Sequence, residues 1–84
     1  MEIPELRQEI DGINEEMKRL MTRRMELARQ IGETKKAQGL PVFDPQREAA
    51  ILEKMTAGTG ADAKYLRRFF AEIFAVCRDC QNER

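Results

Sequence analysis

Hydrophobic residues recur every three or four positions through the N-terminal part of the chain. Starting at Leu6, the steps alternate between four and three, which is the pattern of a helix that packs along another helix. The members of this apolar seam are Leu6, Ile10, Ile13, Met17, Leu20, Leu27 and Ile31. Pro4 suits a first helical turn, and Gly39 with Pro41 would stop the helix at about Gln38. The pattern therefore predicts one long helix before Gly39.

Two shorter helices are predicted after this break. Asp44 and Pro45 suit the N-cap and first residue of a helix that would end at glycines 58–60. We expect four of its residues to face inward, namely Glu48, Ile51, Leu52 and Met55. Asp62 is predicted to cap a third helix whose broad apolar face forms core, made of Leu66, Phe69, Phe70, Ile73, Phe74, Val76 and Cys77. Because no strand pattern or internal repeat occurs, we expect an all-α fold with three helices per chain.

The predicted first helix is too long for a compact chain of 84 residues. At about 1.5 Å per residue it would span about 50 Å, whereas a compact monomer of this size has a radius of gyration of about 12 Å. One chain cannot cover such a seam alone. We therefore expect residues 1–84 to form a single domain that pairs with a second copy.

The composition excludes several kinds of function. The 15 basic and 15 acidic residues balance, so the chain lacks the basic excess that holds nucleic acid. The charged N-terminus lacks the apolar core of a signal peptide, and no apolar run approaches the roughly 20 residues of a membrane helix. We therefore expect a cytoplasmic protein that binds neither nucleic acid nor membrane. The absence of histidine and serine excludes serine–histidine triads, histidine bases and histidine-ligated metals.

Cys77 and Cys80 form a C-x-x-C pair, but nothing else in the sequence completes a metal or redox site. There is no second cysteine pair and no histidine to supply four ligands. The pair also lies late in its predicted helix rather than at the N-terminus that activates a thiol. We expect two free thiols and no bound metal.

Arg24 occupies the position where the apolar seam lacks a hydrophobic residue. A buried guanidinium loses water and recovers that cost only beside an anion, so Arg24 predicts either an internal glutamate partner or a site for an anionic ligand. Lys35 follows eleven residues later, about three turns at 3.6 residues each, and projects from nearly the same face. The residues between them would form an apolar floor, namely Leu27, Ala28 and Ile31. Spacing alone also allows a surface position for Lys35.

Several short motifs follow one another over nearly the whole chain. The segments are LRQEIDGINEEMKRLMTRRMELARQIGETK and LPVFDPQRE, with the patterns LRxxID, an arginine before ELA, a lysine eleven residues later and a PVxDxxRE turn. This ordered set resembles the all-helical (type II) chorismate mutases. The resemblance implies an intertwined homodimer of six helices, with two antiparallel long helices and two active sites. It also implies a cofactor-free enzyme that converts chorismate to prephenate on the route to phenylalanine and tyrosine.

The resemblance implies roles for three residues of the first helix. Arg24 and Lys35 match positions that grip the substrate carboxylates, and Lys35 also reaches the ether oxygen. Arg7 matches an arginine that enters the site from the other subunit. It shares the heptad slot of Lys35 four heptads earlier, so antiparallel first helices would bring these ends together. Without the resemblance, Arg7 would be interpreted as a solvated first-turn arginine.

The other implied site residues lie in the second and third helices. Asp44 would cap the second helix while its backbone holds the substrate hydroxyl. Arg47 matches a site arginine, and Glu48 matches a carboxylate that accepts from the hydroxyl, although the helix dipole alone also favours a first-turn glutamate. Gln81 matches an amide that donates to the ether oxygen, where an isolated late-helix glutamine would usually be at the surface. Cys77 stands where a relative has serine, and a thiol is the weaker donor.

Two other functions remain open from the sequence. The first is a lyase of the same fold that expels pyruvate from isochorismate, although PVFDPQRE looks mutase-like. The second is a non-catalytic helical dimerisation module in which Arg24 would set the register of the helices.

Overall fold

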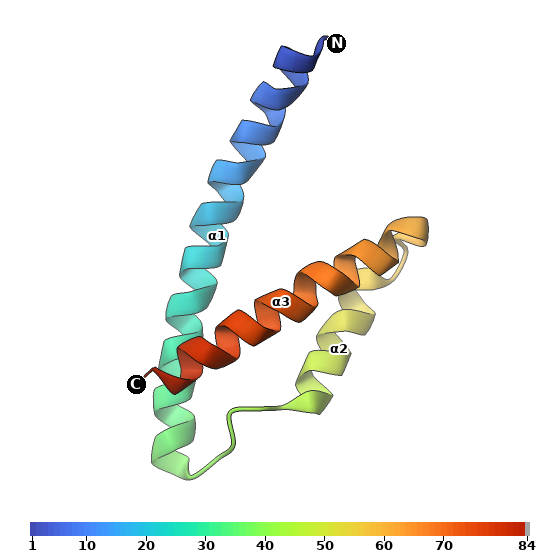
Figure 1. Cartoon of the computed structure of the whole chain (residues 1–84). Coiled ribbons are helices and arrows are strands. Elements are labelled where there is room, and N and C mark those ends of the chain that lie inside the picture. Colours follow the sequence, from blue (N-terminus) through green and yellow to red (C-terminus); the bar gives the residue numbers. More distant parts are fainter. Residues whose placement is uncertain (84) are drawn as a thin grey trace.

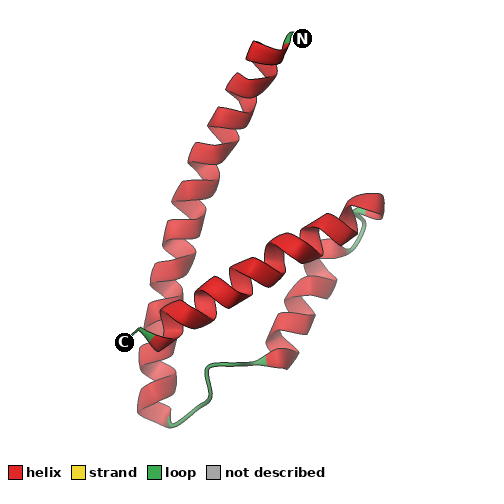
Figure 2. Ribbon diagram, viewed as in Figure 1, coloured by secondary structure: helices red, strands yellow, loops and turns green. Residues whose placement is uncertain are grey.

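The computed structural model describes residues 1–83 and contains three α-helices. They are α1 (Ile3–Gln38), α2 (Pro45–Thr56) and α3 (Ala63–Asn82), and a 3₁₀ turn, η1 (Gly60–Asp62), precedes α3. No strand occurs in this part of the chain (Figure 2), so the prediction of an all-α fold with three helices is confirmed. None of the helices described for residues 1–83 combines the length and apolar character needed to cross a membrane.

Helix α1 ends where the sequence predicted. At its start, Glu5 accepts a hydrogen bond from the backbone N–H of Glu2 (3.3 Å). At its end, Gly39 has a φ of 70°, in the left-handed region that glycine adopts without steric cost. The next N–H, from Leu40, donates to the carbonyl oxygen of Lys35 (2.8 Å). This turn ends α1 and redirects the chain toward α2.

Helix α2 begins at the predicted cap. The side chain of Asp44 accepts a hydrogen bond from the backbone N–H of Arg47 (3.0 Å), which satisfies an amide that the helix itself cannot pair. The predicted inward position of Met55 is wrong, because this residue is exposed while Thr56 is buried. The Thr56 hydroxyl donates to a backbone carbonyl one turn earlier (2.7 Å), so this polar group can be buried without losing a hydrogen bond.

The start of α3 also differs from the prediction. Asp62 lies at the N-cap position, but its side chain makes no capping hydrogen bond. Its backbone is helical, with φ −79° and ψ −11°, because η1 leads directly into α3. A capping side chain reaches the first free amides from an extended backbone, and this 3₁₀ turn removes that geometry.

Helix α3 crosses the C-terminal half of α1, and α2 lies beside α3 (Figure 1). The core at this crossing is small, and the buried hydrophobic residues within 1–83 are Ala28, Phe74, Cys77 and Cys80. Gly32 permits the close approach, because a Cβ atom there would lie 2.2 Å from the backbone oxygen of Gln81. The missing side chain at Gly32 therefore sets the distance between the helices beside Gln81.

An ion pair flanks the crossing on the solvent side. Arg29 of α1 donates from Nε to a carboxylate oxygen of Glu83, just beyond α3, and its Nη1 lies 3.9 Å from Glu26. The hydrogen bond to Glu83 raises the pKa of Arg29 above its ordinary value. Exposed pairs of this kind contribute little to stability, so the crossing depends mainly on apolar packing.

The N-terminal half of α1 extends away from the other helices (Figure 1). Its seam is 42–57% exposed in the single chain, at Leu6, Ile10, Ile13, Met17 and Leu20. The prediction that the whole apolar face of α3 forms core is wrong for one chain, because Phe69 is 62% exposed and Val76 is 38% exposed. The radius of gyration, 15.8 Å, exceeds the roughly 12 Å expected for a compact monomer. The helices of one chain therefore leave much of its apolar surface exposed to solvent.

Candidate active site

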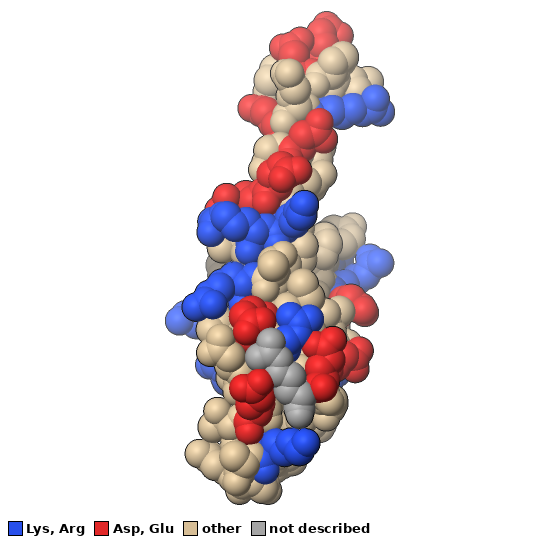
Figure 3. All heavy atoms as spheres, turned by 90° about the vertical axis from the view of Figure 1, so that its left-hand side faces the viewer, with Lys and Arg blue, Asp and Glu red and all other residues tan. Residues whose placement is uncertain are grey.

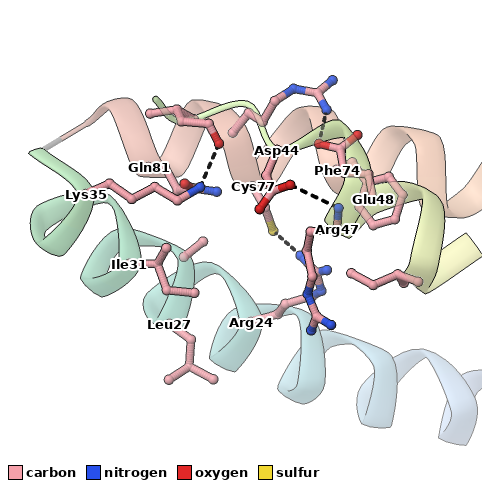
Figure 4. Close-up of a pocket in the computed structure, with 14 residues that line it drawn as sticks. Arg24, Leu27, Ile31, Lys35, Asp44, Arg47, Glu48, Phe74, Cys77 and Gln81 are labelled. Carbon is pink, nitrogen blue, oxygen red and sulfur yellow. Dashed lines mark hydrogen bonds and ion pairs between the residues drawn. The ribbon is translucent and has the colours of Figure 1, made fainter. Parts of the chain in front are cut away.

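Seven of the eight residues implied by the sequence motifs line one cavity of about 430 Å³. The cavity lies between the C-terminal half of α1, the loop of residues 39–44, α2 and α3 (Figure 4). The seven are Arg24, Lys35, Asp44, Arg47, Glu48, Cys77 and Gln81. The predicted apolar floor is also present, with Leu27, Ala28 and Ile31 lining the same cavity. Its size suits a small metabolite.

Arg24 enters the cavity from the middle of α1. Its Nη1 donates to Sγ of Cys77 (2.8 Å), and its guanidinium carbon lies 5.9 Å from the ring centroid of Phe74. No ion pair within residues 1–83 includes Arg24, so the internal glutamate partner is not formed there. Sulfur is a weak acceptor, and the positive charge of Arg24 is left for an anion in the cavity.

Lys35 lies at the other end of the apolar floor (Figure 4). Its Nζ donates to the carbonyl oxygen of Val42 (2.8 Å), which fixes the loop of residues 39–44 against α1. The residue is half-buried rather than on the open surface. An ammonium group has three donors, so two remain for a ligand.

The first turns of α2 contribute three side chains to the cavity. The carboxylate of Asp44 is occupied as the helix cap, while the exposed Arg47 reaches the cavity wall. Glu48 is half-buried, and its Oε2 accepts a hydrogen bond from Nη1 of Arg78 on α3. Glu48 thus does more than complement the dipole of its own helix, because it also forms an ion pair between helices.

Arg78 lines the cavity but is not part of the motifs found in the sequence. Its signal in the sequence is its place one turn before Gln81, since residues three apart share a helix face. That signal is weak, because a charged residue late in a helix usually lies at the surface. The contact with Glu48, which makes the position noteworthy, joins residues 30 positions apart and could not be seen from local spacing.

Gln81 presents an unused amide to the cavity. Its Oε1 is buried without a hydrogen-bond partner, and no hydrogen bond described for residues 1–83 involves its side chain. Unpaired buried polar atoms are costly and uncommon in folded proteins. The residue is half-buried rather than on the surface, and a ligand atom could satisfy the amide.

Arg7 is not brought to the cavity within one chain. It lies exposed near the start of α1, and the 17 residues from Arg7 to Arg24 correspond to about 26 Å along a helix. The role predicted for Arg7 would require a second copy of the chain.

The charges of the cavity suit an anionic ligand. Four cationic side chains line it, namely Arg24, Lys35, Arg47 and Arg78. Of its two carboxylates, one caps a helix and the other is paired with Arg78. Cys77 and Cys80 are free and buried, and residues 1–83 contain no group of three or more metal-binding side chains placed to hold an ion. The arrangement can hold a small dianion and donate hydrogen bonds to it.

The sequence matches known proteins over most of its length. The family described as chorismate mutase type II matches residues 6–82. The T-protein of Haemophilus influenzae is 40% identical over 80 residues, which cover 87% of this chain and 21% of that protein. A bifunctional chorismate mutase/prephenate dehydratase of Aquifex aeolicus is 50% identical over 82 residues, which cover 90% of this chain and 23% of that protein. The chain thus spans less than a quarter of the length of these relatives.

The fold is also similar to a solved structure. Chorismate mutase (form II) from Thermus thermophilus superimposes with a TM-score of 0.90 at 34% sequence identity. The match covers 98% of this chain and 96% of that chain.

Proposed function

The chain belongs to the type II chorismate mutase family, and we propose that it converts chorismate to prephenate without a cofactor. The observation that carries this proposal is the convergence of Arg24, Lys35, Arg47 and Gln81 on one cavity. In this intramolecular [3,3] rearrangement a C–O bond breaks as a C–C bond forms, so no proton is transferred and no covalent intermediate is needed. A chain without histidine or serine can perform it.

The cavity offers the two things that this reaction requires. The substrate dianion must be held in a folded, chair-like shape, and negative charge must be stabilised on the ether oxygen as the C–O bond lengthens. Arg24 and Arg47 supply positive charge for the carboxylates. Lys35 keeps two donors beyond its bond to Val42. The Nε2 amide group of Gln81, which lines the same cavity, is a further donor, so both side chains can donate to the ether oxygen. Glu48 would accept from the substrate hydroxyl.

The proposed enzyme is a homodimer, because a second copy can cover the surface that one chain leaves open. An apolar groove of about 640 Å³ lies between α1 and α3, next to the exposed seam of α1. Its apolar lining consists of Met17, Met21, Met25, Leu66, Phe69, Ile73, Val76 and Cys77. Burying apolar surface of this kind is the main driving force of association.

The charges along α1 favour an antiparallel pairing of the two first helices. The stretch from Glu2 to Glu16 contains six acidic residues and one basic residue, whereas the stretch from Lys18 to Lys36 contains seven basic and two acidic residues. Figure 3 shows mostly acidic side chains at the N-terminal end and a basic band farther along, followed by side chains of both signs. Antiparallel helices place opposite charges together, and parallel helices oppose like charges. The antiparallel arrangement also directs Arg7 of the partner subunit toward the cavity.

An activity assay tests the proposed function. Purified protein is mixed with chorismate, the absorbance of the conjugated diene is followed, and the product is identified. We expect loss of the diene with prephenate as the product. Release of pyruvate from isochorismate, without turnover of chorismate, would indicate the related lyase instead. No turnover of either compound by a folded dimer would indicate a non-catalytic dimerisation module.

A further inference from the structure

Arg78 connects three separate elements beside the cavity. From α3, its Nη1 donates to Oε2 of Glu48 on α2. Its guanidinium carbon also lies 5.2 Å from the ring centroid of Phe43, in the loop that joins α1 to α2. The side chains of Arg78 and Glu48 are 32% and 22% exposed, respectively. Partial burial reduces screening by salt, so this pair restricts both side chains more than a surface pair would.

The ion pair uses only one oxygen of the Glu48 carboxylate. Arg78 holds Oε2, whereas no hydrogen bond described for residues 1–83 reaches Oε1. Fixing one oxygen limits rotation of the carboxylate and leaves the other as an acceptor for a ligand. The position of Arg78 therefore determines where Glu48 can accept a hydrogen bond.

The other cations of the cavity are differently placed. Arg24, Lys35 and Arg47 form no ion pair within residues 1–83, so their charges are available to the substrate carboxylates. The guanidinium of Arg78 is instead engaged by Glu48 and by the ring of Phe43. This difference assigns Arg78 a task separate from binding a carboxylate.

We propose that Arg78 is a positioning residue, which holds Glu48 so that its second oxygen accepts a hydrogen bond from the substrate hydroxyl. Arg78 acts on the substrate through Glu48 and does not touch the reacting atoms. The inference rests on the proposed mutase function. It predicts that Arg78 matters only for a substrate that carries the hydroxyl.

The test compares chorismate with an analogue in which hydrogen replaces the ring hydroxyl. We expect Arg78→Met to lower kcat/KM for chorismate about tenfold and to change it less than twofold for the analogue. Arg78→Lys, which keeps a charged donor to Glu48, should recover activity toward chorismate to within about threefold of the wild type. If the analogue is bound without being turned over, its inhibition constant replaces kcat/KM in the comparison.

Two further variants act as controls. Glu48→Ala should show the same dependence on the hydroxyl, because it removes the acceptor itself. Arg67→Met, at an exposed position of α3, should leave kcat/KM unchanged for both chorismate and the analogue. If Arg78→Met does not fold, Arg78→Gln is measured instead, since a neutral amide can still fill the position.

The outcomes separate this inference from the proposed function. If Arg78→Met lowered kcat/KM equally for chorismate and for the analogue, the inference would be overturned. Equal losses would indicate either direct contact of Arg78 with the substrate or a general structural role. No loss with either substrate would also overturn it. An inactive wild-type protein would contradict the proposed function and this inference together, whereas an active wild type with either of those patterns contradicts the inference alone.

Discussion

Arg24 interrupts the apolar seam of α1 and lines the candidate active site. The guanidinium contacts the sulfur of Cys77 and the ring of Phe74, and neither group carries a full negative charge. A half-buried cation with such partners is stabilised further when an anion binds beside it. We therefore propose that Arg24 binds a substrate carboxylate, at the expense of one apolar position of the helix seam.

Lys35 gives the first prediction at the scale of single residues. We expect Lys35→Ala to lower kcat/KM at least about 100-fold, on the order of 3 kcal/mol, as for loss of one preorganised donor to a developing oxyanion. The loop of residues 39–44 loses its bond at Val42, so circular dichroism should accompany the kinetics. A folded variant with nearly wild-type rates would remove Lys35 from the site.

Gln81 gives a prediction of pH dependence. In Gln81→Glu, a protonated carboxyl can still donate to the ether oxygen, whereas a carboxylate repels the charge that develops there. Turnover by this variant should therefore rise as the pH falls, relative to the wild type measured in the same buffers. Full activity with a flat pH profile would show that Gln81 does not face the ether oxygen.

The sequence predicted the residues that belong to local motifs and missed those whose role depends on distant contacts. Asp44 was identified as a cap because its partner, the amide of Arg47, is three residues away. Gly32 and Arg78 were not identified. Gly32 matters because the backbone of Gln81 passes against it, and Arg78 matters because it meets Glu48 from another helix.

At the scale of helices, the boundaries were predictable because turn chemistry is local. Gly39 and Asp44 end and begin their helices through bonds to residues within one turn. The predictions for Met55 and Phe69 were wrong for a different reason. Apolar residues are buried only where another element covers them, and a single chain provides no cover at these two positions.

Gly32, at the crossing of α1 and α3, gives a prediction at the scale of helices. Gly32→Ala places a Cβ atom against the backbone of Gln81, so α3 must shift and carry Gln81 with it. We expect a loss of at least about tenfold in kcat/KM and a destabilisation of about 1–3 kcal/mol, as for overpacking of a core. Steady-state kinetics and thermal unfolding measure the two effects.

Gly12→Ala is the matched control for this substitution. Gly12 also lies inside α1, but nothing in the chain lies within 4 Å of a Cβ placed there. Alanine should stabilise the helix by roughly 0.5–1 kcal/mol and leave activity unchanged. If the two variants had the same activity, the close approach at Gly32 would not position Gln81.

At the scale of the whole molecule, the single chain leaves large apolar surfaces uncovered. No side chain among residues 1–83 is completely buried, and the seam of α1 and the groove beside α3 are both open. The length of the predicted first helix already indicated a second copy, because the reach of a helix follows directly from its number of residues. How two copies would interlock depends on side-chain packing, which that length does not specify.

These uncovered surfaces lead to a prediction of the oligomeric state. We expect a dimer that does not separate into folded monomers, since the exposed apolar surface would destabilise each one. Sedimentation equilibrium should give twice the mass of the chain, and the thermal midpoint should rise with protein concentration. A folded and active monomer at micromolar concentration would contradict the dimer.

We propose that each active site is built from two chains, with Arg7 supplied by one and Arg24 by the other. Under this arrangement, Arg7→Ala and Arg24→Ala homodimers should each be nearly inactive. A mixed dimer collects both substitutions in one site and neither in the other, so that one site is intact.

The most direct measurement is the activity of such mixed dimers. The two variants are unfolded together and refolded, heterodimers are purified, and each variant refolded alone serves as the control. We predict that the heterodimer recovers the activity of about one working site per dimer, half that of the wild-type dimer. Heterodimers as inactive as their parents would contradict the shared site, because Arg7 and Arg24 would then serve the same pocket from one chain, or Arg7 would be only structural.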